Sequence, residues 1–173
     1  MKKTLFTLAA LMCMILGLTA CGDDNDGPND GVTVSATYEI SFSQDLLDVA
    51  EVTIVYVDNK GQVNLDKPTS NRWTRKVSRE VKNKAVPVEF GYKLVYALKS
   101  NYPDKENYTL TAEGTIKGET PSSSRQFQET LLNGQVGKSR LENVIERGSN
   151  KAFGIVVYKE GRIEQNPLFT VFI

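Results

Sequence analysis

The stretch Val88–Lys99, VEFGYKLVYALK, decides the fold class, because apolar and polar side chains alternate along most of it. Every second side chain of a β-strand points to the same face of its sheet, whereas a helix repeats after about 3.6 residues. The segment therefore predicts a strand with one buried face, formed by Val88, Phe90, Tyr92, Leu94, Tyr96 and Leu98.

The same alternation recurs along the chain. A turn at Asp58–Gly61 separates one such segment from the return arm of a hairpin, since Asn and Gly tolerate positive φ. The segment 71–84 fits a helix as well as a strand, and its β-rich neighbours favour a strand. The other predicted strands are 32–42, 46–57, 62–65, 108–118, 127–132, 152–164 (two arms around Glu160-Gly161) and 168–173.

Short strands that follow one another about every 8–12 residues are typical of all-β sandwiches and barrels. We expect an immunoglobulin-like β-sandwich, because the strands read as short hairpins joined by long loops. The alternative is a closed barrel of the lipocalin kind. A barrel would hold a small ligand in a cavity lined by Tyr38, Tyr92 and Tyr96, whereas a sandwich has a filled core.

One short helix is expected near 140–147. Ser139 and Glu142 have the spacing of a capping box, and Leu141, Val144 and Ile145 follow as an apolar stripe. Gly148 has the position of a helix-ending glycine.

The composition excludes several chemistries. The 173-residue chain has no histidine, and its three methionines and Cys13 all lie within the first twenty residues. Without residues 1–20, Cys21 is the only cysteine and there is no histidine. Disulfides within the chain, His/Cys zinc sites and serine or cysteine triads are therefore excluded. The chain then has 19 basic and 21 acidic residues (21 − 2 against 21), a balance that argues against nucleic-acid binding.

The sequence does not predict an enzyme, a cofactor or a metal site. Glycoside hydrolysis needs two carboxylates roughly 5–10 Å apart. Glu51, Glu89 and Glu113 all lie on polar strand faces, where carboxylates are common in any case.

The first twenty residues read as a secretory signal: Lys2 and Lys3, a short apolar run, and small residues before Cys21. Leu18-Thr19-Ala20-Cys21 resembles the lipobox of bacterial lipoproteins. The resemblance implies cleavage before Cys21 and attachment of acyl chains to it, so that Cys21 is a lipid anchor. Two or more chains hold a protein on a membrane stably, whereas one does not.

Residues 21–32 are rich in Asp, Gly and Asn, and are expected to form a disordered, lipidated tether before a single domain at 33–173. An acidic run directly after the lipidated cysteine resembles the surface-export signal of lipoproteins in certain gut-dwelling Gram-negative bacteria. This resemblance implies an outer-membrane protein that faces the cell exterior.

Three residues are candidate ligand contacts. Arg75 and Arg79 belong to a basic segment, 72–84, which either meets an acidic partner or is a solvated strand face that protects a sheet edge. Tyr102 lies in a loop before Pro103, where an exposed ring could carry a sugar. Trp73, the only tryptophan, is expected to fill the core.

These observations favour a non-catalytic, lipid-anchored binding module on the cell surface that captures glycans or mediates adhesion. The alternatives are a structural or accessory envelope protein that contacts a partner protein, and a carrier barrel for a small ligand. The expected partners are the membrane, through Cys21, and a polysaccharide or an envelope protein.

Overall fold

The computed structural model describes residues 31–83 and 85–170, and everything said here about the structure refers to them. The signal, the lipobox with Cys21 and nearly all of the tether lie outside the described residues, as do residues 171–173. In chain order the elements are β1 (Val32–Phe42), α1 (Gln44–Val49), β2 (Ala50–Val57), β3 (Val63–Asp66), β4 (Arg72–Val81), β5 (Val88–Leu98), β6 (Asn107–Glu119), β7 (Ser124–Gly137), a 3-10 turn (Lys138–Arg140), α2 (Leu141–Gly148), β8 (Lys151–Val157) and β9 (Ile163–Gln165).

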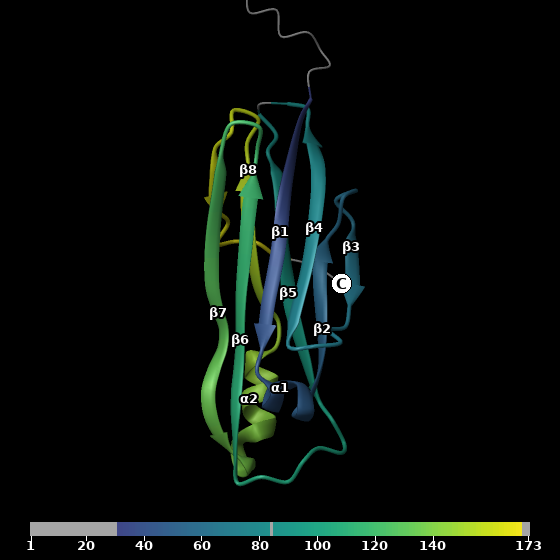
Figure 1. Ribbon diagram of the computed structural model, residues 1–173, viewed down its shortest axis with the longest axis vertical. Helices are drawn as coiled ribbons and strands as arrows, with labels where there is room; N and C mark the ends of the chain where they lie inside the picture. The colour runs from purple at the N-terminus through teal and green to yellow at the C-terminus, as the bar shows by residue number, and fades with distance from the viewer. Residues whose placement is uncertain (1–30, 84, 171–173) are drawn as a thin grey trace, which may run out of the picture.

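The strands form two antiparallel sheets that pack face to face (Figure 1). Sheet A has the order β4-β1-β6-β7, and sheet B has the order β3-β2-β5-β8-β9. No ladder among the described residues joins the two sheets, so the all-β sandwich is confirmed and the closed barrel is wrong.

The connectivity is compatible with an immunoglobulin-like sandwich. In that fold strands B and E share one sheet, while C and F share the other. Here β1 pairs with β4, β2 pairs with β5, and the chain crosses between the sheets from β1 to β2, from β3 to β4 and from β4 to β5. The long β6–β7 hairpin extends sheet A on the far side of β1.

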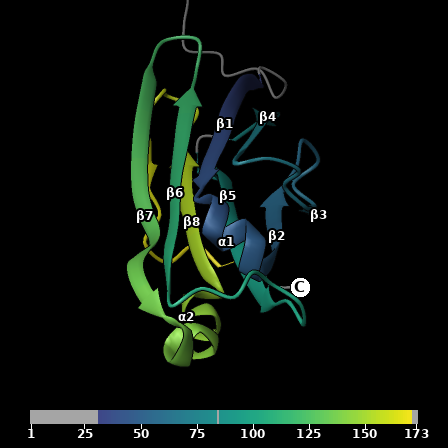
Figure 2. The same cartoon turned by 60° about the horizontal axis from the view of Figure 1, so that its bottom comes forward.

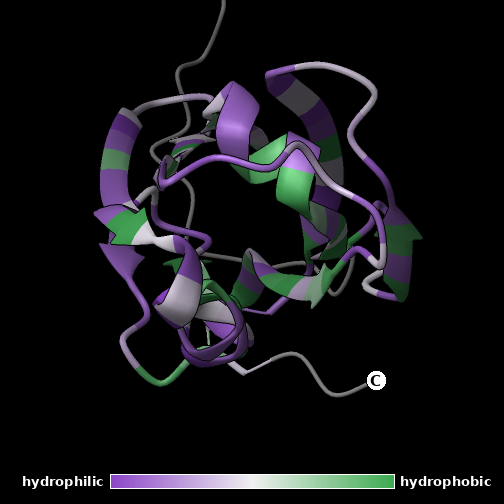
Figure 3. Ribbon diagram, turned by 90° about the horizontal axis from the view of Figure 1, so that it is seen from below, coloured by the Kyte–Doolittle hydropathy of each residue, from purple (hydrophilic) through white to green (hydrophobic). Residues whose placement is uncertain are grey.

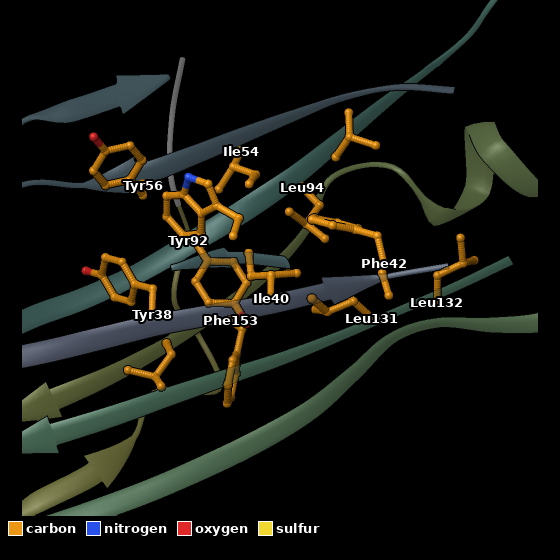
Figure 4. Close-up of a cluster of buried hydrophobic side chains, with 14 of the residues drawn as sticks. Tyr38, Ile40, Phe42, Ile54, Tyr56, Tyr92, Leu94, Leu131, Leu132 and Phe153 are labelled. Atoms are coloured by element: carbon orange, nitrogen blue, oxygen red, sulfur yellow. The ribbon is translucent and has the colours of Figure 1, made fainter. Parts of the chain in front are cut away.

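The core lies between the sheets and consists of the alternating apolar residues that the sequence predicts. The rings of Tyr38, Tyr92 and Phe153 pack edge to face, with centroids 5.8 and 6.0 Å apart (Figure 4). Trp73 is 7 % exposed and stacks on Tyr38 at 6.4 Å, which confirms its core position. Tyr38, Tyr92 and Tyr96 thus belong to a packed core and not to the wall of a barrel.

The predicted helix is confirmed as α2, but its ends differ from those expected. Ser139 lies inside the 3-10 turn, so Arg140 is the N-cap and makes no side-chain capping bond. Gly148 is the last helical residue, and the positive φ belongs to Asn150, at 67°.

The sequence analysis missed α1, assigning part of it to the following strand. Ser43 caps this helix, because its hydroxyl accepts a hydrogen bond from the backbone N–H of Leu46 at 3.3 Å. The helix buries Leu46 and Val49 completely. Both helices lie at the end of the sandwich opposite to the start of β1 (Figures 1 and 2).

The described part of the expected last strand, residues 168–170, does not form a strand. Leu168, Phe169 and Thr170 lie outside the strands, after a turn at Asn166. Phe169 instead packs on the outer face of sheet B, where it forms a second apolar cluster with Val55.

Candidate functional site

Arg75 and Arg79 lie on the inward face of β4, in the same row as the buried Trp73, Val77 and Val81. Since β4 is an edge strand of sheet A, their long side chains lie along the open side of the sandwich. The Arg75 guanidinium lies 5.5 Å from the Tyr56 ring centroid, and the Arg79 guanidinium lies 5.9 Å from that of Phe90.

Both arginines are bound to sheet B. Arg75 forms an ion pair with Asp66 of β3 at 2.6 Å, and Arg79 donates a hydrogen bond to the backbone carbonyl of Glu89 at 2.9 Å. Charged residues that point inward from an edge strand also oppose strand-to-strand aggregation. The placement of Arg75 and Arg79 is compatible with a role in protecting the edge of sheet A, although the two side chains do not belong to a solvated strand face as that alternative expected.

Asp66 is the centre of this contact between the sheets. Its carboxylate also accepts a hydrogen bond from the Trp73 indole N–H at 3.0 Å. These hydrogen bonds, that of Trp73 first and that of Arg75 next, lower the pKa of Asp66 although partial burial opposes them. The Asp66 carboxylate is thus held ionised between β3 and β4.

Tyr102 is half-buried, so less of its ring can contact a ligand than the ring of a fully exposed loop tyrosine. Its ring packs against that of Tyr108, with centroids 6.1 Å apart and planes at 76°. The Tyr108 hydroxyl donates to the Pro103 carbonyl at 2.9 Å and accepts from the Lys105 N–H at 3.1 Å. This arrangement, similar to the tyrosine corner of immunoglobulin-like domains, fixes the β5–β6 loop.

A groove of about 450 Å³ opens at the helix end of the sandwich. We call it the distal groove, because it lies opposite to the start of β1. Figure 3 looks onto this end, whose loops are largely hydrophilic. The groove is lined by Gln44 and Leu47 of α1, Ala50, Glu51 and Val52 of β2, the β3–β4 loop 67–71, and Lys99 after β5.

Backbone and side-chain contacts hold the walls of the distal groove in place. The Asn71 carbonyl accepts a hydrogen bond from the Phe42 N–H at 2.8 Å. Lys99 donates from its ammonium to the Leu47 carbonyl at 2.6 Å. Lys67 pairs with Glu51 across the groove at 3.0 Å. Glu51 and Lys67 offset each other's charge and Lys99 is engaged by a carbonyl, so the groove suits a polar ligand without strong charge.

None of the three candidate contacts lines the distal groove. The sequence analysis missed the groove because its side chains come from α1, β2, a loop and the end of β5. Polar residues in the loop 67–71 were the available signal, but nothing in the sequence places them beside α1.

The three glutamates considered for glycoside hydrolysis are not brought together. Glu51 pairs with Ala97 of β5, eight residues along that strand from Glu89, which corresponds to about 26 Å. Glu113 belongs to the other sheet. The part of the chain that the structure describes also contains no group of three or more His, Cys, Asp or Glu side chains able to hold a metal ion.

No helix of the described residues is long and apolar enough to cross a membrane. Comparisons of the chain with protein-family models, with curated proteins and with solved structures found no match. The site is therefore argued from its own residues.

Proposed function

We propose that the protein is a non-catalytic, lipid-anchored binding module of the outer membrane, facing the cell exterior, and that the distal groove binds an oligosaccharide. The position and chemistry of the groove support this proposal most directly. It is open, lined mainly by polar side chains, and located at the end of the domain opposite to the point where the anchored chain enters.

The lipobox at Leu18–Cys21 would hold the start of β1 near the membrane. From Cys21 to Val32 the chain spans at most about 40 Å when fully extended. An anchor on that side leaves the opposite end, with the distal groove, turned toward the medium. This orientation suits the capture of an extended polymer or adhesion to a surface.

The groove chemistry favours sugars over polyanions. The exposed Thr69 hydroxyl and Asn71 amide can exchange hydrogen bonds with sugar hydroxyls. Gln44 and Ser70 already donate to Asp48 and to the Arg72 carbonyl, and their oxygens can accept from a sugar. The Glu51–Lys67 pair offers both a donor and an acceptor. Arg75 and Arg79, the candidates for an acidic ligand, are already bound to sheet B.

The proposal is tested with a glycan array, followed by calorimetry on the best ligand, using the full chain purified in detergent. Thr69→Ala with Asn71→Ala should weaken binding about tenfold, which corresponds to ~1.4 kcal/mol, the size of one or two hydrogen bonds. The matched control is Gln126→Ala with Gln128→Ala, on the exposed side of β7, which should bind like the unaltered chain. Absence of glycan binding, or equal loss in the control, would contradict the proposal.

Protease treatment of intact cells tests the location. Loss of the domain, while a periplasmic protein survives, is the expected result. Protection of the domain would place it inside the envelope and would contradict the surface assignment.

One observation favours the alternative of an accessory envelope protein that contacts a partner protein. The outer face of sheet B carries exposed apolar side chains, among them Val63 at 44 % and Leu65 at 60 % exposure. Such patches often mark protein contacts. Chemical cross-linking in intact cells separates the two functions, since only the accessory role requires a protein captured at β3.

A further inference from the structure

Strand β7 forms the edge of sheet A that lies opposite to β4 (Figures 1 and 2). It has 14 residues, and among the described strands only β6 pairs with it. The backbone N–H and C=O groups that point away from β6 are therefore open to another strand. The edges of sheet B offer much less, since β3 has four residues and β9 has three.

The usual protections of an exposed edge are largely absent from β7. Proteins commonly guard an edge strand with lysines, prolines or a bulge. Strand β4 carries four Arg or Lys side chains, whereas β7 contains neither Lys nor Pro. Its bulge is at Leu131, which has no Cα partner on β6. The bulge leaves residues 124–130 as a regular edge, in which every residue except Phe127 is exposed.

The sequence of residues 124–130, SRQFQET, is self-complementary. Two antiparallel copies that pair about the central phenylalanine bring similar polar residues and opposite charges face to face: Phe127 with Phe127, Gln126 with Gln128, Arg125 with Glu129, and Ser124 with Thr130. A two-fold axis repeats every contact, so two Arg125–Glu129 pairs form at once. Directly opposed side chains of opposite charge stabilise an antiparallel pair. No other register brings Arg125 opposite Glu129.

Arg125 and Glu129 both belong to the inward row of β7, because their partners on β6 are buried glycines. The Arg125 guanidinium lies 4.9 Å from the Phe127 ring centroid and donates to the Ile163 carbonyl at 3.2 Å, so it is held along the edge with donors to spare. Glu129 is exposed and takes part in none of the ion pairs of residues 31–83 and 85–170. A second copy of the strand supplies the opposite charge for it.

We propose that β7 binds a second copy of this chain, with residues 124–130 paired antiparallel about Phe127 in a symmetric dimer. The pairing joins the four strands of sheet A in each copy into one continuous sheet. Main-chain hydrogen bonds supply the affinity, and the side-chain pairs fix the register. The distal groove receives no residue from β7, so this inference does not depend on sugar binding.

Charge reversal tests the register, using the full chain purified in detergent and sedimentation velocity at rising protein concentration. The unaltered chain should form a dimer. Arg125→Glu sets two glutamates against each other at both ends of the pairing, and Glu129→Arg does the same with arginines. Each variant should therefore dimerise about 10- to 100-fold more weakly. An equimolar mixture of the two variants should form dimers again, because every charge then meets its opposite.

The mixture separates this interface from damage to the fold, since Arg125→Glu also removes the hydrogen bond to Ile163. Gln135→Glu is the matched control, because it adds a charge at an exposed position of the same strand outside the paired segment. It should dimerise like the unaltered chain.

Hydrogen exchange shows which strand is covered. When about nine tenths of the chains are paired, every second amide of residues 124–130 should exchange about tenfold more slowly, and the amides of the opposite edge, β4, should not change. A chain that stays monomeric at every concentration would overturn the proposal, and so would a mixture of the two variants that fails to dimerise. Dimers with unchanged exchange in β7 would overturn it as well, because another surface would then join the copies.

Discussion

The hydroxyl of Tyr38 joins the two sheets, and its removal is the sharpest test of this structure. From β1 of sheet A, the hydroxyl donates a hydrogen bond to the Val57 carbonyl at 3.1 Å and accepts one from the Gly91 N–H at 3.0 Å. The β2–β5 ladder ends at the Tyr56–Tyr92 pair, so the tyrosine bonds to backbone groups just beyond that ladder. Tyr38 itself is completely buried.

Tyr38→Phe keeps the ring and removes only the oxygen. A buried donor or acceptor without a partner costs about 1–3 kcal/mol. Two such groups give an expected loss of about 2–6 kcal/mol in the free energy of unfolding. At ~2–4 °C per kcal/mol for a domain of this size, the Tm should fall by about 4–24 °C.

Tyr92→Phe is the matched control, because Tyr92 is also completely buried while its hydroxyl has no hydrogen-bond partner among the described residues. Its removal should leave the Tm unchanged or raise it slightly, since a buried polar group is lost without a broken bond. Both variants are measured by thermal and urea unfolding followed by circular dichroism. Equal losses of stability in the two variants would refute the reasoning, because ring packing alone would then explain both.

Three further predictions concern stability. A methyl group on Gly114 would overlap the Tyr92 hydroxyl and lie 2.9 Å from Leu131 Cδ1, so Gly114→Ala should lower the free energy of unfolding in urea by about 1–3 kcal/mol. Gly134→Ala is the control, because its methyl group would lie 4.0 Å from the nearest atom and should cost little stability. Equal losses of stability in the two variants would contradict the prediction. Asp66→Asn should destabilise the protein by about 1 kcal/mol at pH 7. The folded state lowers the pKa of this carboxyl, so its stabilisation is fully present above the unfolded pKa and shrinks as the pH falls through the folded one. The difference in stability between the two proteins should therefore narrow during acid titration, and a pH-independent difference would be inconsistent with this. Burial raises the pKa of Tyr38, Tyr92 and Tyr96 above the ordinary tyrosine value of 10. Above pH 10 the unfolded chain therefore loses phenol protons that the folded chain keeps, and each of these tyrosines should lower the free energy of unfolding by ~1.4 kcal/mol per pH unit. A stability curve that is flat between pH 10 and 11 would contradict this prediction.

Much of the fold could be predicted from local patterns. Alternation along 88–99 and 32–42 identified both strands and their buried rows, because the period of two depends on the backbone alone. The stripe at Leu141, Val144 and Ile145 identified α2 in the same way. The short helix α1 was not predicted, because six residues carry little periodic signal and its N-cap, Ser43, resembles any loop serine.

The candidate site was much harder to predict than the fold. The sequence predicted Arg75 and Arg79 as contacts of an acidic ligand or as part of a solvated strand face, whereas the structure places them on the inward row of an edge strand. Their role depends on β4 being at the edge and β3 lying opposite, and strand order is a non-local property. The distal groove depends on the same property, since α1 and the loop 67–71 are separated by a complete hairpin.

The sequence by itself determined the β class, the alternating core, α2, and the absence of histidine and of disulfide chemistry after residue 20. These follow from side-chain periodicity and from composition, which need no knowledge of contacts between distant residues. Only the tertiary structure decided which strands share a sheet, that the sandwich stays open, and that Asp66 and the arginines bridge its open side. It also decided that Phe169 covers sheet B instead of forming a strand, because its seat is made by Gly91 and Gly154 on two different strands. Pairing and packing between segments far apart in sequence carry that information, and no local pattern encodes it.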